Sequence, residues 1–212
     1  MTLKAIVFDY GKVLTHPPTD ADWARLAGMF GVPVPEFQQP YWGLRDKYDR
    51  AVHDGSSYWQ AVGAQLGKTL SKDDVAQLIS LDNTQWTNAN PEMLDFAWRA
   101  QDAGLKIGIL SNMQHDMLAA MRKKLPWLDR FDAQIYTCEI GAIKPEPPSY
   151  HAVLQALGVR SAESIFFDDK PVNIEGALAV GMHAELFEGD VATAYGAIER
   201  LGSPVPLRKA AE

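Results

Sequence analysis

The chain has 212 residues, of which 47% are hydrophobic and 22% are charged, as in an ordinary globular protein. Its formal net charge of −7 argues against a nucleic-acid partner, because phosphate backbones are bound by basic surfaces. The single cysteine excludes an intrachain disulfide, and no window approaches the about 18 uninterrupted apolar residues of a membrane-spanning helix.

The first predicted element is a strand at residues 4–8, an apolar run that ends at Asp9 and is followed by the turn signal Gly11. The run is too short and too interrupted for a signal peptide. We therefore expect a cytoplasmic protein without membrane contact. A monomer and a homodimer are both left open by the sequence.

Residues 16–88 carry only helical patterns. In one of these patterns Ser71 precedes Asp74 by three positions, which is typical of a capping box at a helix start. We predict an all-helical insert over 16–88, called the cap below. The predicted helices cover residues 22–30, 34–52, 57–66 and 71–86.

Strand and helix patterns alternate after the cap, which predicts a Rossmann-like, doubly wound parallel sheet covered by helices on both faces. The predicted α/β core comprises residues 1–15 and 89–202, and the tail 203–212, with two prolines, is expected to be flexible. The predicted strands are 106–110, 133–137, 164–167 and 183–187, and the predicted helices are 91–103, 149–157 and 173–180.

Polar residues follow three of the predicted strands directly. They are Asp9, the pair Ser111 and Asn112, and the pair Asp168 and Asp169. Ligands of open parallel sheets bind beyond the carboxyl ends of the strands, so these side chains are expected to share one crevice. Singly, each has a plainer interpretation as a turn or helix-cap residue. Their recurrence at strand ends favours a site.

This set of residue types points to phosphoryl transfer. Clustered carboxylates repel one another unless a cation lies between them, and all-oxygen ligands suit Mg²⁺. A hydroxyl and a lysine can hold a phosphate, and Lys144, in a loop stiffened by Pro145 and Pro147, is a candidate although it could be a surface lysine. A carboxylate nucleophile can form an aspartyl-phosphate.

Four segments resemble, in order, the motifs of the haloacid dehalogenase superfamily. The resemblance covers residues 3–15 and 91–188 and is closest to the branch of glucose-1-phosphate phosphatases and the amino-terminal phosphatase domain of soluble epoxide hydrolase. Its fourth motif is the most specific. The segments are IVFDYGKVLT, ILSN, IKPEPPSYHAVLQALG and IFFDDKPVNIEGALAVGM.

The resemblance implies a metal site and a nucleophile. Asp9 would be the covalent nucleophile, and Asp9, the backbone carbonyl of Gly11 and Asp169 would bind Mg²⁺. Asp168 would bind the metal through water or orient the lysine of the third motif. Asn173 would lie near the metal and contact its ligands without binding the metal itself. The cap would be a lid that excludes water.

The resemblance also implies a phosphate site. Ser111 and Asn112 would hold the phosphoryl oxygens, and Lys144 would neutralise phosphate charge, with Ser111 and Lys144 taking part in catalysis. The substrate would be a small phosphorylated metabolite, for example a sugar phosphate.

Gly11 is a departure from the family pattern. Most phosphatases of the family carry a second Asp there, which protonates the leaving group and is typically worth about 10²–10⁴-fold in rate. Without it we expect substrates whose leaving group departs easily as an anion, such as sugar-1-phosphates, acyl phosphates and aryl phosphates. The candidates for a replacement proton donor are Lys12, Arg45, Asp46 and His53.

The cap is rich in aromatic residues. We expect most of them to pack between cap helices and a subset to line a substrate pocket. The residues concerned are Tyr41, Trp42, Tyr48, Tyr58, Trp59 and Trp86.

Two other functions stay open on the sequence. One is haloacid dehalogenation, in which Asp9 attacks carbon without a metal; the acidic pair at 168–169 argues against it. The other is a non-catalytic, phosphate-binding or regulatory protein of the same fold; Gly11 favours it, and the retained Asp9 and Lys144 argue against it.

Overall fold

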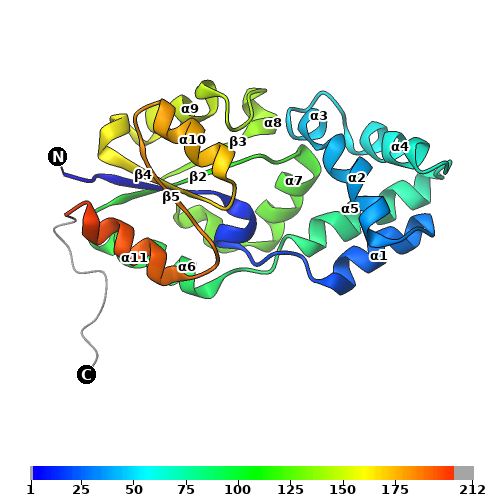
Figure 1. Ribbon diagram of the computed structural model, residues 1–212, viewed down its shortest axis with the longest axis horizontal. Helices are drawn as coiled ribbons and strands as arrows, with labels where there is room; N and C mark the ends of the chain where they lie inside the picture. Colours follow the sequence, from blue (N-terminus) through cyan, green and yellow to red (C-terminus); the bar gives the residue numbers. More distant parts are fainter. Residues whose placement is uncertain (1, 203–212) are drawn as a thin grey trace.

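A computed structural model describes residues 2–202, which form an α/β core and a lobe of helices beside it (Figure 1). The core is built on a five-stranded sheet in the order β3-β2-β1-β4-β5, with every neighbouring pair parallel. The predicted fold class is therefore confirmed. The bounds of the strands are β1 Ala5–Phe8, β2 Lys106–Ser111, β3 Ala133–Tyr136, β4 Ser164–Asp168 and β5 His183–Leu186.

The central strand β1 pairs with β2 on one side and with β4 on the other. All four residues of β1 are buried, as are all five of β4, because helices cover both faces of the sheet. In this register Phe8 stands beside Ile109 and Phe167, so the residues that follow the three strands emerge at one edge of the sheet.

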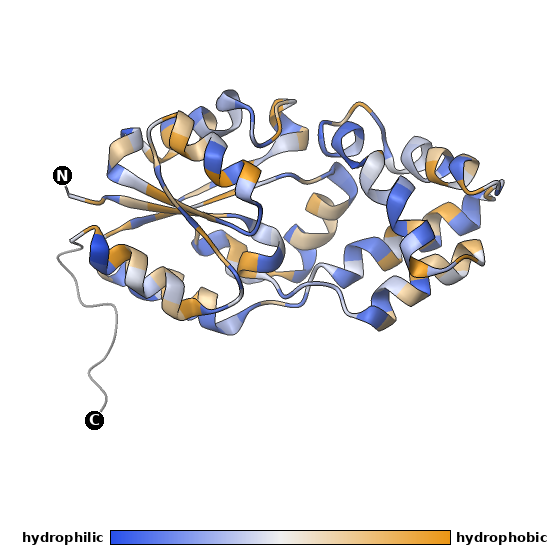
Figure 2. Ribbon diagram, viewed as in Figure 1, coloured by the Kyte–Doolittle hydropathy of each residue, from blue (hydrophilic) through white to orange (hydrophobic). Residues whose placement is uncertain are grey.

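Helices on the two faces pack on separate apolar clusters. The strands between them consist largely of hydrophobic residues (Figure 2). One face carries α9 (Pro147–Leu157) and α10 (Pro171–Ala179), and the other carries α6 (Pro91–Asp102), α7 (His115–Lys124) and α11 (Val191–Arg200). The short helix α8 (Thr137–Ile140) follows β3. Helix α11 was not predicted, although Asp190 caps it by accepting a hydrogen bond from the Ala192 N–H.

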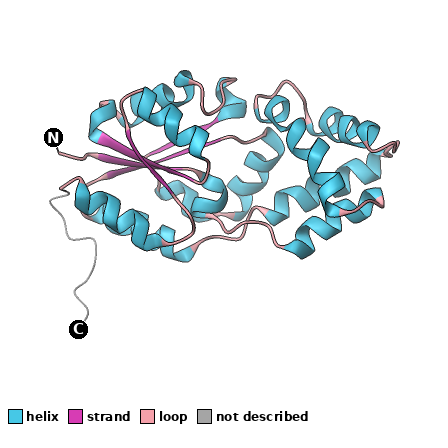
Figure 3. Ribbon diagram, in the orientation of Figure 1, coloured by secondary structure: helices cyan, strands magenta, loops and turns pink. Residues whose placement is uncertain are grey.

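The lobe beside the core consists of helices and the turns that join them (Figure 3). The capping box predicted at Ser71 is present, with Ser71 and Asp74 bonded reciprocally. The lobe has its own apolar cluster, to which Phe37, Tyr58 and Trp59 belong. Its helices are α1 (Asp20–Phe30), α2 (Val34–Gly43), α3 (Arg45–Asp49), α4 (Gly55–Gln65) and α5 (Lys72–Gln85).

The continuous helical pattern expected over 34–52 is wrong in detail. Helix α2 ends at Gly43, a poor helix former, and α3 resumes after Leu44. Ala51 then takes a left-handed conformation with φ 59°, which cannot continue a helix.

The domain boundaries at residues 15, 88 and 202 remain predictions, and the expected flexible tail 203–212 lies outside the described residues. Among residues 2–202, every helix falls short of the length and apolar character needed to cross a membrane.

Candidate active site

A cavity of about 440 Å³ opens where the carboxyl ends of the strands face the cap. Most of the site residues predicted from the sequence line it, from both the core and the cap. The lining comprises Asp9, Tyr10, Gly11, Lys12, Trp42, Arg45, Asp46, Asp49, Trp86, Ser111, Asn112, Met113, Gln114, Met117, Lys144, Asp169, Lys170 and Asn173.

Asp9 follows β1 and is fixed by three hydrogen bonds or ion pairs. Its backbone N–H donates to the Phe167 carbonyl at 2.8 Å, which ties it to β4. Its Oδ1 accepts from the Tyr10 N–H at 2.7 Å and from Lys144 Nζ at 2.8 Å. Burial raises the pKa of Asp9 to about 7, although the Lys144 charge opposes this shift.

Lys144 lies in the loop before α9 and is fully enclosed, with a side chain only 1% exposed. Asn112 holds that loop from both sides: its Oδ1 accepts from the Lys144 N–H at 2.9 Å, and its Nδ2 donates to the Lys144 carbonyl at 3.2 Å. The ammonium pairs with Asp168 Oδ2 at 2.7 Å as well as with Asp9. Burial disfavours its charge, but Asp168 and Asp9 outweigh burial and raise the Lys144 pKa.

Asp168 is occupied by partners of its own. Asn173 Nδ2 donates to both of its oxygens at 3.0 Å, and the Lys170 N–H donates to Oδ1 at 2.8 Å. Together with Lys144 these donors engage both carboxylate oxygens. Asp168 therefore orients Lys144 through the ion pair and is poorly placed to bind an ion directly.

The carboxylates of Asp9, Asp168 and Asp169 each offer an oxygen within 4.8 Å of the other two. Because Asp168 is engaged, Asp9 and Asp169 are the acidic ligands left for an ion. The carbonyl of Gly11 belongs to a residue that lines the same cavity. An all-oxygen set with open space for water fits a hard divalent cation such as Mg²⁺. Asp169 also pairs with Lys12 Nζ at 2.9 Å.

Ser111 and Asn112 lie at the end of β2, as expected, and both line the cavity. Ser111 is 2% exposed. Asn173 is likewise buried behind Asp168. The structure thus brings all eight predicted site residues to one end of the sheet.

Position 11 faces an indole ring. A Cβ atom added to Gly11 would lie 3.4 Å from Cζ3 and 3.6 Å from Cε3 of Trp86, a residue just after α5. Trp86 is anchored because its carbonyl accepts from Tyr10 Oη at 2.7 Å and its Nε1 donates to Tyr41 Oη at 3.4 Å. A side chain at position 11 would therefore begin in van der Waals contact with the Trp86 ring.

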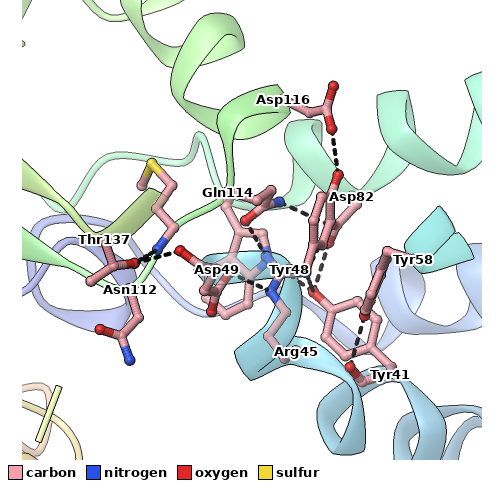
Figure 4. A network of polar contacts seen from close by, with 12 residues as sticks. Tyr41, Arg45, Tyr48, Asp49, Tyr58, Asp82, Asn112, Gln114, Asp116 and Thr137 are labelled. Carbon is pink, nitrogen blue, oxygen red and sulfur yellow. Dashed lines mark hydrogen bonds and ion pairs between the residues drawn. The ribbon is translucent and has the colours of Figure 1, made fainter. Parts of the chain in front are cut away.

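The cap wall contains a buried polar network that the sequence analysis missed (Figure 4). Arg45 donates to Asp49 Oδ1 at 3.1 Å, to Asp82 Oδ2 at 2.9 Å and to Gln114 Oε1 at 2.8 Å. Gln114 lies just before α7, so this network joins the cap to the core. The spacing of Arg45 and Asp49, four residues apart, was the one local signal for it.

Three of the four candidates for a replacement proton donor line the cavity: Lys12, Arg45 and Asp46. His53 is not among the lining residues. Asp49, which no sequence pattern singled out, also lines the cavity, and burial raises its pKa to about 6 against the opposing charge of Arg45.

The aromatic residues of the cap divide as expected into packing and lining groups. Trp42 and Trp86 line the cavity. The other four are buried in the apolar cluster of the cap: Tyr41, Tyr48, Tyr58 and Trp59.

Residues 3–181 match the family model of the haloacid dehalogenase-like hydrolases, which covers most of the chain and every residue of the site described above. The chain belongs to this family. It is a hydrolase of the haloacid dehalogenase type, as the four motifs predicted.

The chain is similar to several curated proteins and solved structures, over different shares of their length. A phosphatase of Mycobacterium tuberculosis is 29% identical over 96% of this chain and 95% of its own length. Bifunctional epoxide hydrolase 2 of Rattus norvegicus is 33% identical over 67% of this chain, which spans only 26% of that longer protein. A haloacid dehalogenase family enzyme of Bacteroides thetaiotaomicron, solved with magnesium and inorganic phosphate, superposes with a TM-score of 0.70 at 19% identity. That superposition covers 88% of this chain and 95% of the other, and it supports the fold.

Proposed function

We propose that this chain is a Mg²⁺-dependent phosphohydrolase that acts on a small phosphorylated metabolite through an aspartyl-phosphate at Asp9. One observation carries the proposal. The buried Lys144 ammonium lies between the carboxylates of Asp9 and Asp168, beside the acidic ligand Asp169, at the base of a cavity large enough for a small substrate.

In the proposed reaction an oxygen of Asp9 attacks phosphorus, the bond from phosphorus to the leaving oxygen breaks, and that oxygen keeps the electron pair. Water then hydrolyses the aspartyl-phosphate and releases inorganic phosphate. The Tyr10 N–H and the Lys144 ammonium both contact Oδ1 of Asp9, and these contacts fix the rotation of its carboxylate.

The phosphoryl group carries negative charge, which Lys144 is placed to neutralise. We propose that the Ser111 hydroxyl donates to a phosphoryl oxygen. The Asn112 side-chain amide has a second N–H proton besides the one bonded to the Lys144 carbonyl, and we assign this proton to another phosphoryl oxygen.

Asp9, Asp169 and the Gly11 carbonyl are the residues that would hold Mg²⁺. When bound, the ion supplies charge neutralisation at the phosphoryl oxygens. The residues of this chain then position the substrate and exclude water, with the cap covering the cavity. The solved relative that contains magnesium and phosphate supports this assignment by analogy of fold.

The test is a panel of phosphate esters assayed with Mg²⁺ and with EDTA. Turnover is expected with Mg²⁺ and should vanish in EDTA and in Asp9→Asn. Beryllofluoride with Mg²⁺ should form an adduct on Asp9 that ¹⁹F NMR detects. Binding of phosphate without any turnover or adduct would instead support the non-catalytic alternative that Gly11 suggests. Halide release from a 2-haloacid without metal would support the dehalogenase alternative.

A further inference from the structure

Two tryptophans form an aromatic surface beside the proposed phosphoryl site. Trp42 of α2 and Trp86 after α5 have ring centroids 6.3 Å apart at an interplanar angle of 74°, and both line the cavity that holds Asp9. Lys170 Nζ, from the segment after β4, lies 5.7 Å from the centroid of the Trp42 ring. The aromatic surface therefore meets the core at Lys170, inside the cavity that holds Asp9.

Trp42 is unusually exposed for an indole. It is 41% exposed, and only three other large hydrophobic residues within residues 2–202 are more exposed. The other aromatic residues predicted for the cap are buried. Because exposed apolar surface next to a polar site is typical of ligand pockets, a ligand that covers Trp42 would remove this surface from water.

Trp86 lies beside position 11. A Cβ atom added to Gly11 would lie 3.4 Å from its ring, and the one N–H of the indole donates to Tyr41 Oη. The indole thus presents carbon atoms, and no proton donor, on the side of Gly11. A leaving group beside it has to depart without protonation from position 11.

Three polar residues that line the cavity near the aromatic surface are already bonded to other side chains. Arg45, Asp49 and Gln114 line the cavity, but each is bonded within the network shown in Figure 4. A sugar would need hydrogen-bonding groups for several hydroxyls, and using these side chains would leave buried charges unpaired. Asp46 is the remaining acidic residue of this wall and lies exposed.

We propose that the substrate is an aryl phosphate monoester whose aromatic ring packs against Trp42 and Trp86. This inference rests on the proposed function and names its substrate class. A phenol has a pKa of about 10, so its anion is a far better leaving group than an alkoxide. Asp9 attacks phosphorus, the phosphorus–oxygen bond to the ring breaks, the phenolate leaves with the electron pair, and water later protonates it.

The test measures kcat/KM for phenyl phosphate, acetyl phosphate and glucose 1-phosphate in the parent and in Trp42→Ala. The quantity compared between variants is the ratio of kcat/KM for phenyl phosphate to kcat/KM for acetyl phosphate. The intrinsic reactivity of each substrate cancels in this comparison. An aromatic contact is worth about 0.5–1.5 kcal/mol, so the ratio of kcat/KM for phenyl phosphate to that for acetyl phosphate should fall about two- to twelvefold in Trp42→Ala. Trp42→Phe keeps a ring and should keep most of the ratio.

The matched control is Trp98→Ala, which removes an indole that packs on Phe131 and Arg130 and does not line the cavity. This control should leave the ratio unchanged. A second readout is binding with Mg²⁺ present. Phenylphosphonate should bind more tightly than methylphosphonate by calorimetry, and Trp42→Ala should reduce that difference.

The two proposals fail in different ways. If acetyl phosphate and glucose 1-phosphate turn over but the ratio is unmoved by Trp42→Ala, the aryl inference is overturned and the phosphohydrolase stands. A preference for glucose 1-phosphate over phenyl phosphate, or equal affinity for the two phosphonates, has the same consequence. If none of the three substrates turns over with Mg²⁺, the proposed function itself fails.

Discussion

Lys144 Nζ lies 2.8 Å from Asp9 Oδ1 and is shielded from water, so the proposed nucleophile and its neighbouring cation form a buried ion pair. The same ammonium reaches Asp168 at 2.7 Å. A buried charge with one partner removed costs far more than the pair contributes when intact. Lys144 therefore bears on both the charge of the site and the stability of the fold.

We expect Lys144→Ala to lower the free energy of unfolding by about 3–5 kcal/mol, because Asp9 and Asp168 would be left buried without their cation. Turnover of any phosphate ester should also be lost. Urea unfolding and the ester assay measure the two effects. The control is Lys123→Ala, at an exposed position of α7, which should change neither. Wild-type stability in Lys144→Ala would contradict the burial of this ion pair.

Mg²⁺ binding should depend on pH, because burial raises the pKa of Asp9 to about 7 and an ion must displace the proton. The affinity should rise about fivefold between pH 6 and pH 7, about tenfold between pH 6 and pH 8, and level off above pH 8, as expected for release of one proton. Calorimetry in buffers of different ionisation enthalpy measures this release. Asp9→Asn should remove the pH dependence of Mg²⁺ binding. If the affinity of the parent for Mg²⁺ does not change between pH 6 and pH 8, the raised pKa of Asp9 is refuted.

The raised pKa of Asp9 also predicts how the stability of the metal-free protein varies with pH. The folded state keeps the Asp9 proton up to about pH 7, whereas the unfolded chain loses it near 3.8. Between these values the unfolded state binds fewer protons, so the contribution of Asp9 to stability falls as pH rises through this window. With EDTA at pH 8, Asp9→Asn should melt at a higher temperature than the parent. The difference in melting temperature between Asp9→Asn and the parent should be smaller at pH 5. A larger difference at pH 5 would show that the pKa of Asp9 is shifted in the opposite direction.

Much of the site could be predicted because its residues follow short buried strands. The alternation of apolar runs and helical patterns placed Asp9, Ser111 and Asp168 at strand ends, and parallel pairing of β1 with β2 and β4 brings those ends together. Lys144 was a weaker prediction from the residues alone. Its direction depends on two hydrogen bonds to Asn112, and no local pattern reveals a contact between segments so far apart in the chain.

The contacts of the cap with the core could not be predicted either, because they too join segments that are far apart in the chain. Arg45 pairs with Asp82 of another helix and with Gln114 of the core, and a charged residue on a helix is ordinarily solvated. The place of Trp86 against Gly11 depends on how the cap sits on the core. The sequence showed that position 11 lacks an acid, but not that an indole ring lies beside it.

Arg45 should be essential to the cap because it is buried with two acidic partners, Asp49 and Asp82. We expect Arg45→Met to lower the free energy of unfolding by about 3–5 kcal/mol. Adding Asp82→Asn should recover part of this loss, since one unpaired buried charge is removed. Arg25→Ala is the matched control; its ion pair with Asp22 is exposed and should be worth at most about 1 kcal/mol. Additive effects in the double variant would argue against a shared network.

Gly11 offers a test of whether Trp86 blocks an acid at this position. Gly11→Ala should be tolerated, because φ −69° and ψ 129° suit any residue and the added Cβ would only touch the ring. Gly11→Asp pushes a carboxylate against the indole and should cost about 1–3 kcal/mol of stability without raising turnover of ethyl phosphate.

Combining Gly11→Asp with Trp86→Ala makes room for the carboxylate near the leaving oxygen. Turnover of ethyl phosphate, an ester with a poor leaving group, should then exceed that of Gly11→Asp alone by at least about tenfold, toward the 10²–10⁴-fold typical of a general acid. Phenyl phosphate should gain much less, because its anion leaves without a proton. If Gly11→Asp alone already accelerates ethyl phosphate hydrolysis, then Trp86 is not what keeps an acid from working beside Asp9.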